Sequence, residues 1–167
     1  VTLWDINGDG TEDCVISTWR GDNTVRAFNG KNGKELWSYQ AGGWMYHGPS
    51  LGDVTGDGEP ELAIGGYDKK LHIISMKGEK IRIVDIKENI LAPTVMHDCD
   101  GDGVMEMLVC TCRSTVLAVK GDGSVLWKKN AGKGCIWRGA VLAEVDGIKG
   151  VELLVQPSES CALIALN

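Results

Sequence analysis

A nine-residue acidic motif recurs along the chain, and its spacing is the feature that most limits the possible folds. Copies occupy residues 5–13, 53–61, 98–106 and, in a degenerate form, 144–152. Successive copies begin 48, 45 and 46 residues apart, so the 167 residues hold three repeat units and most of a fourth. A unit of this length is one supersecondary element, and it buries its hydrophobic surface only by stacking against its neighbours.

Each repeat unit is predicted to contain four short β-strands. A first strand leads into the acidic motif, and a second, apolar strand leaves it, as residues 62–65 do in the second unit. A third strand follows a short turn and a fourth follows a glycine turn, as at residues 24–28 and 35–39. Glycine makes up 23 residues and falls between the short apolar runs, which is typical of many tight turns, and no segment keeps helical apolar spacing. The pattern predicts an all-β fold, a β-propeller of four-stranded antiparallel blades.

We interpret residues 1–167 as a single partial propeller domain of about 3.5–4 blades. The approximate repeat units are residues 1–43, 44–88, 89–134 and 135–167. The last unit stops before a fourth strand, and an unclosed propeller exposes a sheet edge and an apolar blade face. We therefore expect a fragment of a larger propeller, or a ring closed by two or more copies. Because residue 1 falls inside a predicted strand, any targeting signal is expected outside these residues.

Alternating oxygen-bearing residues make each well-preserved acidic motif a candidate Ca²⁺ site. Ca²⁺ takes six to eight oxygen ligands, and glycines at the fourth and sixth positions permit a tight turn. Ligands are expected at positions one, three, five, seven and nine, with the seventh supplying a backbone carbonyl. The predicted ligands are Asp5, Asn7, Asp9, Thr11 and Asp13; Asp53, Thr55, Asp57, Glu59 and Glu61; and Asp98, Asp100, Asp102, Val104 and Glu106.

About three calcium ions are expected per chain, and their charge would neutralise the net charge of −6. Without an ion the carboxylates of one motif would repel one another, so occupancy should stabilise the fold. The fourth motif has Ile148 and Lys149 where an oxygen ligand and a glycine belong. We predict that this motif is empty and that Lys149 replaces the cation.

Two other interpretations of the acidic motifs are weaker. A single copy is also typical of a solvated turn, because Asn-Gly and Asp-Gly favour turns without a metal, but three copies in register favour a metal. EF-hands and dockerins begin with a similar motif, yet they carry a Glu at position 12 and flanking helices. Position 12 is here Ile16, Ile64 or Val109, and the flanks are strand-like.

The acidic motifs, each followed by an apolar strand, resemble the calcium-loop repeats of FG-GAP type found in integrin α-subunit propellers and many secreted bacterial proteins. Residues 25–37, where a Gly-Lys turn precedes Trp37, also resemble the repeat of quinoprotein (PQQ)-like propellers, in which such a Trp packs between blades. These resemblances imply a calcium-binding propeller of about seven or eight blades. They place it outside the cytoplasm: extracellular, on the cell surface or periplasmic.

Aromatic and cationic residues precede the first strand of the second and fourth units at matching positions. They are candidates for stacking on a sugar or anchoring a peptide. The candidate ligand-binding residues are Trp44, Tyr46, His47, Trp137 and Arg138. Alternatively, the three aromatic residues are wedges packed between blades. Trp37 and Trp127, at equivalent fourth-strand positions, are interpreted as packing residues.

Six cysteines occupy different repeat positions without Cys-x-x-Cys spacing, which argues against a zinc site. Cys110 and Cys112 would face the same way in a strand, as a soft-metal or redox pair or as small packing residues, and we favour packing. An extracellular setting permits disulfides, but the sequence gives no pairing. His47, His72 and His97 differ in repeat position, so no metal triad is predicted.

Absent motifs and the net charge exclude several classes of function. The sequence contains no nucleophile-elbow, zinc-protease or phosphate-loop motif. With 17 basic and 23 acidic residues, a nucleic acid is not an expected partner, and no apolar run predicts membrane insertion. We expect a non-catalytic calcium-binding module for adhesion or for binding a protein or carbohydrate ligand. The alternative is part of an enzyme propeller, either PQQ-dependent dehydrogenase-like or a calcium-propeller polysaccharide lyase; the non-adjacent Cys110 and Cys112 weigh against the dehydrogenase.

Overall fold

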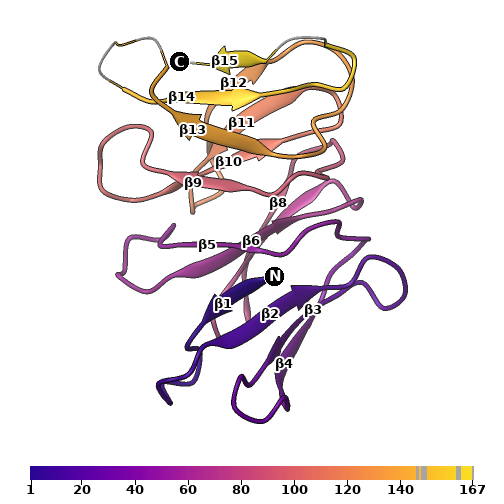
Figure 1. The fold of residues 1–167 in the computed structure, drawn as a ribbon, viewed down its shortest axis with the longest axis vertical. Coiled ribbons are helices and arrows are strands. Elements are labelled where there is room, and N and C mark those ends of the chain that lie inside the picture. Colours follow the sequence, from indigo (N-terminus) through magenta and orange to yellow (C-terminus); the bar gives the residue numbers. More distant parts are fainter. Residues whose placement is uncertain (146, 148–149, 161–162, 167) are drawn as a thin grey trace.

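The computed structural model describes residues 1–145, 147, 150–160 and 163–166. These residues form fifteen strands and no helix, arranged as four antiparallel sheets. The sheets follow one another in chain order along the long axis of the molecule, with the first and the last at opposite ends (Figure 1). The predicted all-β fold of stacked four-stranded units is confirmed.

Each sheet is a simple meander in which consecutive strands pair. The first sheet contains β1 (Thr2–Trp4), β2 (Asp13–Ser17), β3 (Thr24–Phe28) and β4 (Glu35–Gln40). The second contains β5 (Ser50–Gly52), β6 (Glu61–Gly65), β7 (Lys70–Ile74) and β8 (Lys80–Asp85). The third contains β9 (Val95–His97), β10 (Glu106–Cys110), β11 (Thr115–Val119) and β12 (Val125–Asn130). The described strands of the fourth are β13 (Ala140–Ala143), β14 (Glu152–Val155) and β15 (Ile164–Leu166).

The acidic motifs are the loops that join the first and second strands of each sheet. We call residues 5–13, 53–61, 98–106 and 144–152 the first to fourth acidic loops. The predictions about Ile148 and Lys149 lie outside the described residues, as do Cys161 and Ala162 of the predicted last strand.

The hydrophobic core lies between the sheets. In β6, Leu62 and Ile64 pack toward the first sheet, whereas Ala63 packs toward the third. In β10, Met107 packs toward the second sheet and Leu108 toward the fourth. Because successive side chains of a strand point to opposite faces, an apolar run buries both faces of each inner sheet. The second and third sheets are thus held by apolar burial on both sides.

Side chains of the fourth strands also bond adjacent sheets together. Trp37 Nε1 donates to the carbonyl oxygen of Met76 at 2.9 Å, and Arg82 Nε donates to that of Gly121 at 3.1 Å in the next pair of sheets. The Trp37 ring lies so close over Gly78 that a Cβ there would come within 2.6 Å of it. Trp127 packs against the cluster between the third and fourth sheets. Both tryptophans therefore pack between blades.

The outward faces of the first and last sheets remain open. Leu3 pairs with Cys14, which pairs with Phe28, so these three share one face; Leu3 is 53% exposed. At the other end Val141, opposite Leu154, is 63% exposed. The four sheets are an arc of a propeller with an apolar face at each end.

Candidate metal loops and an aromatic cluster

The first residue of each of the first three acidic loops organises the loop around its carboxylate. Asp5, Asp53 and Asp98 accept hydrogen bonds from the backbone N–H of the sixth-position glycine at 2.8, 2.9 and 3.0 Å. These glycines have φ values of 84°, 88° and 88°, in the left-handed region that favours glycine. Desolvation acts to raise the pKa of Asp53, but the backbone N–H groups of Gly58, Gly56, Asp57 and Thr55 together outweigh it and lower the pKa.

The ninth residue of each loop is a buried carboxylate at the start of the second strand. Asp13, Glu61, Glu106 and Glu152 accept from the backbone N–H of the second loop residue at 3.0, 3.0, 2.7 and 2.8 Å. The fourth loop keeps this bond despite its degenerate sequence. Burial raises the pKa of Glu61, opposed by the N–H of Val54.

The fifth-position carboxylates close the inside of the loop. Asp9, Asp57 and Asp102 accept from the backbone N–H of the seventh residues Thr11, Glu59 and Val104 at 3.0, 2.9 and 2.8 Å. At the third position, Asn7 Oδ1 accepts from the N–H of Asp9 at 2.9 Å, and Thr55 Oγ1 donates to Glu61 Oε1 at 3.3 Å. One bonding scheme thus recurs in three loops that lie far apart in the sequence.

The third acidic loop brings three predicted ligands together. Asp98, Asp100 and Glu106 each place a carboxylate oxygen within 4.8 Å of the others. Within the part of the chain that the structure describes, this is the one group of three His, Cys, Asp or Glu side chains that converges so closely. Carboxylates at this separation repel one another unless a cation lies among them.

Lys120, in the turn between β11 and β12, supplies a positive charge to the third loop. Its Nζ lies 2.6 Å from Asp100 Oδ2, 3.2 Å from Asp102 Oδ2 and 3.8 Å from Glu106 Oε1. Hydrogen bonds to Asp100 and Asp102 raise the pKa of Lys120. We predicted a substituting lysine in the fourth loop; sequence reasoning missed Lys120 because a different turn carries it to the third.

The other two loops differ in how their charge is neutralised. In the first, Lys31 Nζ lies 3.0 Å from Asp9 Oδ1, and this bond is the main cause of the lowered pKa of Asp9. At the turn position of Lys120 the first sheet has Asn29 and the second has Ser75. Among the residues described, the carboxylates of the second loop have no ion pair with a lysine or arginine. The second loop therefore keeps the most unbalanced negative charge.

An exposed aromatic cluster lies at the opposite end of the strands from the acidic loops. We define it as Trp19, Trp44, Tyr46, Tyr67 and Trp137. Ring centroids are 5.0 Å apart for Trp19 and Tyr46, 5.5 Å for Trp44 and Tyr67, 5.6 Å for Tyr46 and Tyr67, and 6.3 Å for Tyr46 and Trp137. Trp44, Tyr46 and Trp137 are 39%, 40% and 48% exposed, so the structure places all three at the surface. Whether they bind a ligand stays a prediction.

The remaining candidate ligand residues, His47 and Arg138, have no ring contact with the cluster among the described interactions. His47 is half-buried, its Nδ1 donates to the carbonyl oxygen of Gly48 at 2.9 Å, and burial lowers its pKa. Arg138 is exposed and, with Trp137, lines a separate cavity of about 240 Å³.

Sequence reasoning missed Trp19, Arg20 and Tyr67. The Arg20 guanidinium lies 5.2 Å from the ring centroid of Trp19 and 5.4 Å from that of Trp44, within cation–π range. A signal was available, because Trp19, Tyr67 and Cys112 hold the same place in the turn after the second strand of successive units.

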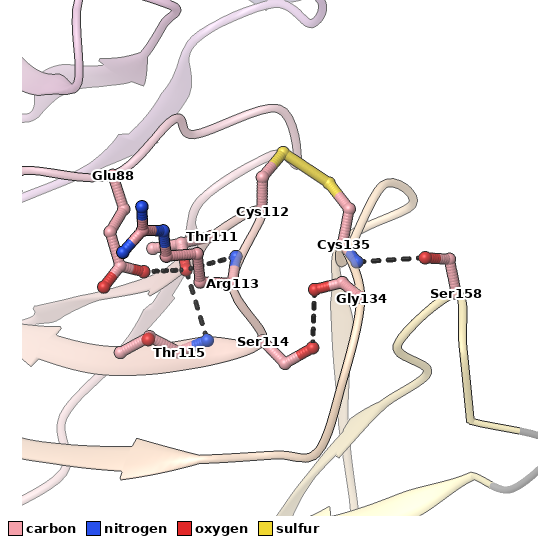
Figure 2. Close-up of a disulfide and its surroundings, with 9 residues drawn as sticks. All are labelled: Glu88, Thr111, Cys112, Arg113, Ser114, Thr115, Gly134, Cys135 and Ser158. Atoms are coloured by element: carbon pink, nitrogen blue, oxygen red, sulfur yellow. Dashed lines mark hydrogen bonds between the residues drawn. A yellow bond between two sulfur atoms is a disulfide. The ribbon is translucent and has the colours of Figure 1, made fainter.

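A disulfide between Cys112 and Cys135 joins the third sheet to the connection that enters the fourth (Figure 2). Close by, Ser114 Oγ donates to the carbonyl oxygen of Gly134 at 2.8 Å, and the N–H of Cys135 donates to Ser158 Oγ at 2.9 Å. The interpretation of Cys112 as a packing residue in a strand was wrong, because β10 ends at Cys110 and Cys112 lies in the turn beyond it. Cys110 is a free, buried thiol whose pKa burial raises to about 12.

Comparison with known proteins supports the resemblances. Residues 5–64 match the family model of the FG-GAP-like repeat, which spans the first two acidic loops. No curated protein matches the sequence. Among the described residues, no helix has the length and hydrophobicity needed to cross a membrane.

Solved structures resemble the whole arc of sheets. BBS1N, crystallised in complex with ARL6DN, superposes with a TM-score of 0.68 at 13% identity, covering 99% of this chain and 53% of its own. The Vibrio cholerae biofilm matrix protein Bap1 gives 0.54 at 23% identity, covering 93% of this chain and 34% of its own. Quinohemoprotein alcohol dehydrogenase from Comamonas testosteroni gives 0.52 at 13% identity, covering 71% of this chain and 20% of its own. The chain thus spans about half the length of BBS1N, and these likenesses establish a shared fold.

Proposed function

We propose that this chain is a calcium-stabilised part of a β-propeller whose aromatic cluster binds a protein or carbohydrate ligand, as a module for adhesion or partner binding in an extracytoplasmic protein. The observation that carries the proposal is the hydrogen-bonding scheme that recurs in three acidic loops. It holds carboxylates at positions one, five and nine in every copy.

The donor chemistry of these loops fits Ca²⁺. Carboxylate, amide and hydroxyl oxygens are hard ligands, and neither a thiolate nor an imidazole is among the predicted ligand set. Asp53, Asp57 and Glu61 would hold the ion in the second loop, and Asp98, Asp100 and Glu106 in the third. A bound ion would supply positive charge to the second loop, which has no ion pair with a lysine or arginine among the described residues, and would take the place of the Lys120 ammonium in the third.

The second loop is the strongest of the three candidate sites. Its carboxylates lack the ammonium group that Lys31 and Lys120 bring to the first and third loops. A resident ammonium must be displaced before Ca²⁺ enters, and this lowers the apparent affinity. We expect calcium to fill the second loop first, with the other two loops bringing the total to about three ions per chain.

The aromatic cluster is the proposed ligand-binding surface. Exposed Trp and Tyr side chains present large, rigid contact area with few rotatable bonds, as at sugar-binding and protein-binding sites. The cluster draws on the first, second and fourth units, so only the stacked sheets assemble it. Bap1, which this chain resembles in fold, is a biofilm matrix protein, and this agrees with the proposed adhesive role.

Two features support the proposed extracytoplasmic location. A disulfide persists in oxidising compartments, and acidic Ca²⁺ loops suit millimolar calcium. The likeness to quinohemoprotein alcohol dehydrogenase concerns the fold alone.

Calorimetric titration of the chelator-treated protein with CaCl₂ tests the calcium part of the proposal. We expect saturable binding, and a loss of the tightest site in Asp57→Asn, which removes one ligand charge with little change of shape. Asp85→Asn, an exposed carboxylate of the same sheet outside the loop, is the matched control. Absence of binding heat, or equal effects of the two substitutions, would contradict the assignment.

A further inference from the structure

A cavity of about 320 Å³ opens beside the aromatic cluster, between the first and second sheets. It lies where the turn after β2, the connection from β4 to β5 and the turn after β6 meet. Its lining residues are Asn23, Gly42, Gly43, Trp44, Tyr67 and Asp68.

Two glycines bring the connecting backbone against Asp68. A Cβ on Gly42 would lie 2.7 Å from Asp68 Oδ2, and one on Gly43 would lie 2.6 Å from the backbone nitrogen of Asp68. Larger residues at these positions would push the connection away from the carboxylate. The glycine pair therefore shapes the wall of the cavity around Asp68.

The Asp68 carboxylate is fixed by a buried row of hydrogen bonds. Its side chain is 9% exposed, and Oδ2 lies 2.8 Å from His72 Nε2. His72 Nδ1 lies 2.9 Å from the hydroxyl oxygen of Tyr39 on the neighbouring sheet. With a proton on Nε2, His72 donates to Asp68, and its Nδ1 shares a hydrogen bond with the Tyr39 hydroxyl.

Asp68 is therefore a negative charge inside the cavity. Burial acts to raise its pKa, but the bond from His72 and the N–H groups of Lys70 and Gly42 outweigh burial and hold the pKa below its usual value. Oδ1, whose bond from the N–H of Lys70 is 3.3 Å long, keeps capacity to accept from a ligand.

The rest of the lining also favours a cation. Asn23 Oδ1 is buried and has no hydrogen-bond partner within the described structure. Trp44 and Tyr67 meet edge to face, and aromatic faces attract cations. Arg20 already places its guanidinium over Trp44, so this surface accommodates such a group within the molecule itself.

We infer that this cavity binds a side-chain cation, a lysine ammonium or arginine guanidinium, of a basic protein partner. The inference deepens the proposed function and rests on it, since the cavity adjoins the aromatic cluster. A cation fits better than a sugar because the two side-chain oxygens with capacity left, Asp68 Oδ1 and Asn23 Oδ1, are acceptors, whereas sugar hydroxyls both donate and accept. The nearly buried Asp68 carboxylate gives local charge complementarity to a basic partner, and this does not depend on the net charge that bound calcium would neutralise.

The test is a titration of the full chain, with calcium present, followed through the indole ¹⁵N–¹H signal of Trp44 by NMR. The probes are Nα-acetyl-arginine amide and its neutral isostere Nα-acetyl-citrulline amide. We expect arginine amide to shift the signal saturably and citrulline amide to bind at least roughly tenfold more weakly, because a hydrogen bond to a charged group is the stronger kind. Equal binding of the two probes, or no shift with arginine amide up to its solubility limit, would overturn the inference.

Two variants sharpen the test. Asp68→Asn should weaken arginine amide binding roughly tenfold, whereas Asp85→Asn should leave it unchanged. Arg20→Gln removes a competing guanidinium and should strengthen binding, a gain that misfolding cannot produce. Weaker binding in Arg20→Gln would contradict the inference.

A parallel titration with N-acetylglucosamine separates this inference from the proposed function. If the sugar shifts the Trp44 signal and arginine amide does not, the cation inference fails while the aromatic cluster remains a binding surface. If neither arginine amide nor N-acetylglucosamine shifts the Trp44 signal, the proposed ligand-binding role of the cluster fails as well.

Discussion

At the residue scale, each carboxylate of an acidic loop has a different hydrogen-bonding role. The first residue collects N–H groups from the turn, the ninth anchors the second strand from a buried position, and the fifth closes the loop from inside. The sequence predicted these positions as calcium ligands, because alternate residues in a tight loop can aim oxygens at one centre, but it did not predict which N–H groups their carboxylates bind. The contact of Lys120 with the third loop could not be predicted from the sequence, because only the pairing of β10 with β11 brings its turn beside that loop.

Lys120 gives the first prediction. Lys120→Gln should raise the calcium affinity of the third loop about tenfold, because no ammonium then has to be displaced from Asp100 and Asp102. Without calcium, the same change should lower the free energy of unfolding, since the clustered carboxylates lose their counter-charge. Calorimetry and urea unfolding measure the two effects.

Lys77→Gln is the matched control for this prediction, because Lys77 lies in the corresponding turn of the second sheet. It should change neither quantity. An unchanged calcium affinity in Lys120→Gln would show that Lys120 does not compete for the site.

At the scale of elements, the repeat predicted the strands well. The acidic motif marks the first turn of each unit, and the glycines mark the last. The apolar strands between these turns can be buried only between stacked sheets. The contacts between units were less predictable. The joining of Trp19, Tyr46 and Trp137 into one cluster depends on how the sheets stack, and the Cys112–Cys135 pairing depends on two loops from different units.

The disulfide gives the second prediction. It closes a segment of 23 residues between the third sheet and the fourth. Closing a loop of this length stabilises the folded state by about 3 kcal/mol in the chain-entropy model. Cys112→Ser should therefore lower the free energy of unfolding by roughly this amount, and the fourth sheet should open first, as followed by hydrogen exchange of β13 and β14.

Cys14→Ser, which removes a free thiol from the first sheet, serves as the control and should cost much less. Adding a reductant should destabilise the unmodified protein but not Cys112→Ser. Equal behaviour of the two in reductant-free buffer would contradict a stabilising disulfide.

At the scale of the whole molecule, the arc of sheets has two open apolar faces. We propose that further blades or a second copy cover them in a closed ring, because exposed apolar faces of this kind are sites of association. Each end sheet has a neighbour on one face only. In the inner sheets, by contrast, strands β6 and β10 are apolar and buried on both faces.

The open faces give the third prediction. The isolated chain of 18.0 kDa should self-associate at high concentration in sedimentation velocity, because association buries the exposed apolar faces. Leu3→Asp or Val141→Asp should weaken the association, whereas Ile81→Asp, on the exposed strand β8 of an inner sheet, should not. A monomer at every concentration would show that the faces are stable uncovered.

The central claim is that the acidic loops hold calcium and thereby stabilise the stacked sheets. Thermal unfolding of the chelator-treated protein at increasing free Ca²⁺, with Mg²⁺ at equal ionic strength as the control, tests it most directly. One site at a hundredfold excess over its Kd adds about 2.7 kcal/mol, which raises the Tm of a chain of this size by roughly 5 to 10 °C. We predict at least this rise, specific to Ca²⁺ and reduced in Asp57→Asn. A Tm that is the same with chelator, Mg²⁺ and Ca²⁺ would contradict the claim and leave the acidic loops as hydrogen-bonded turns.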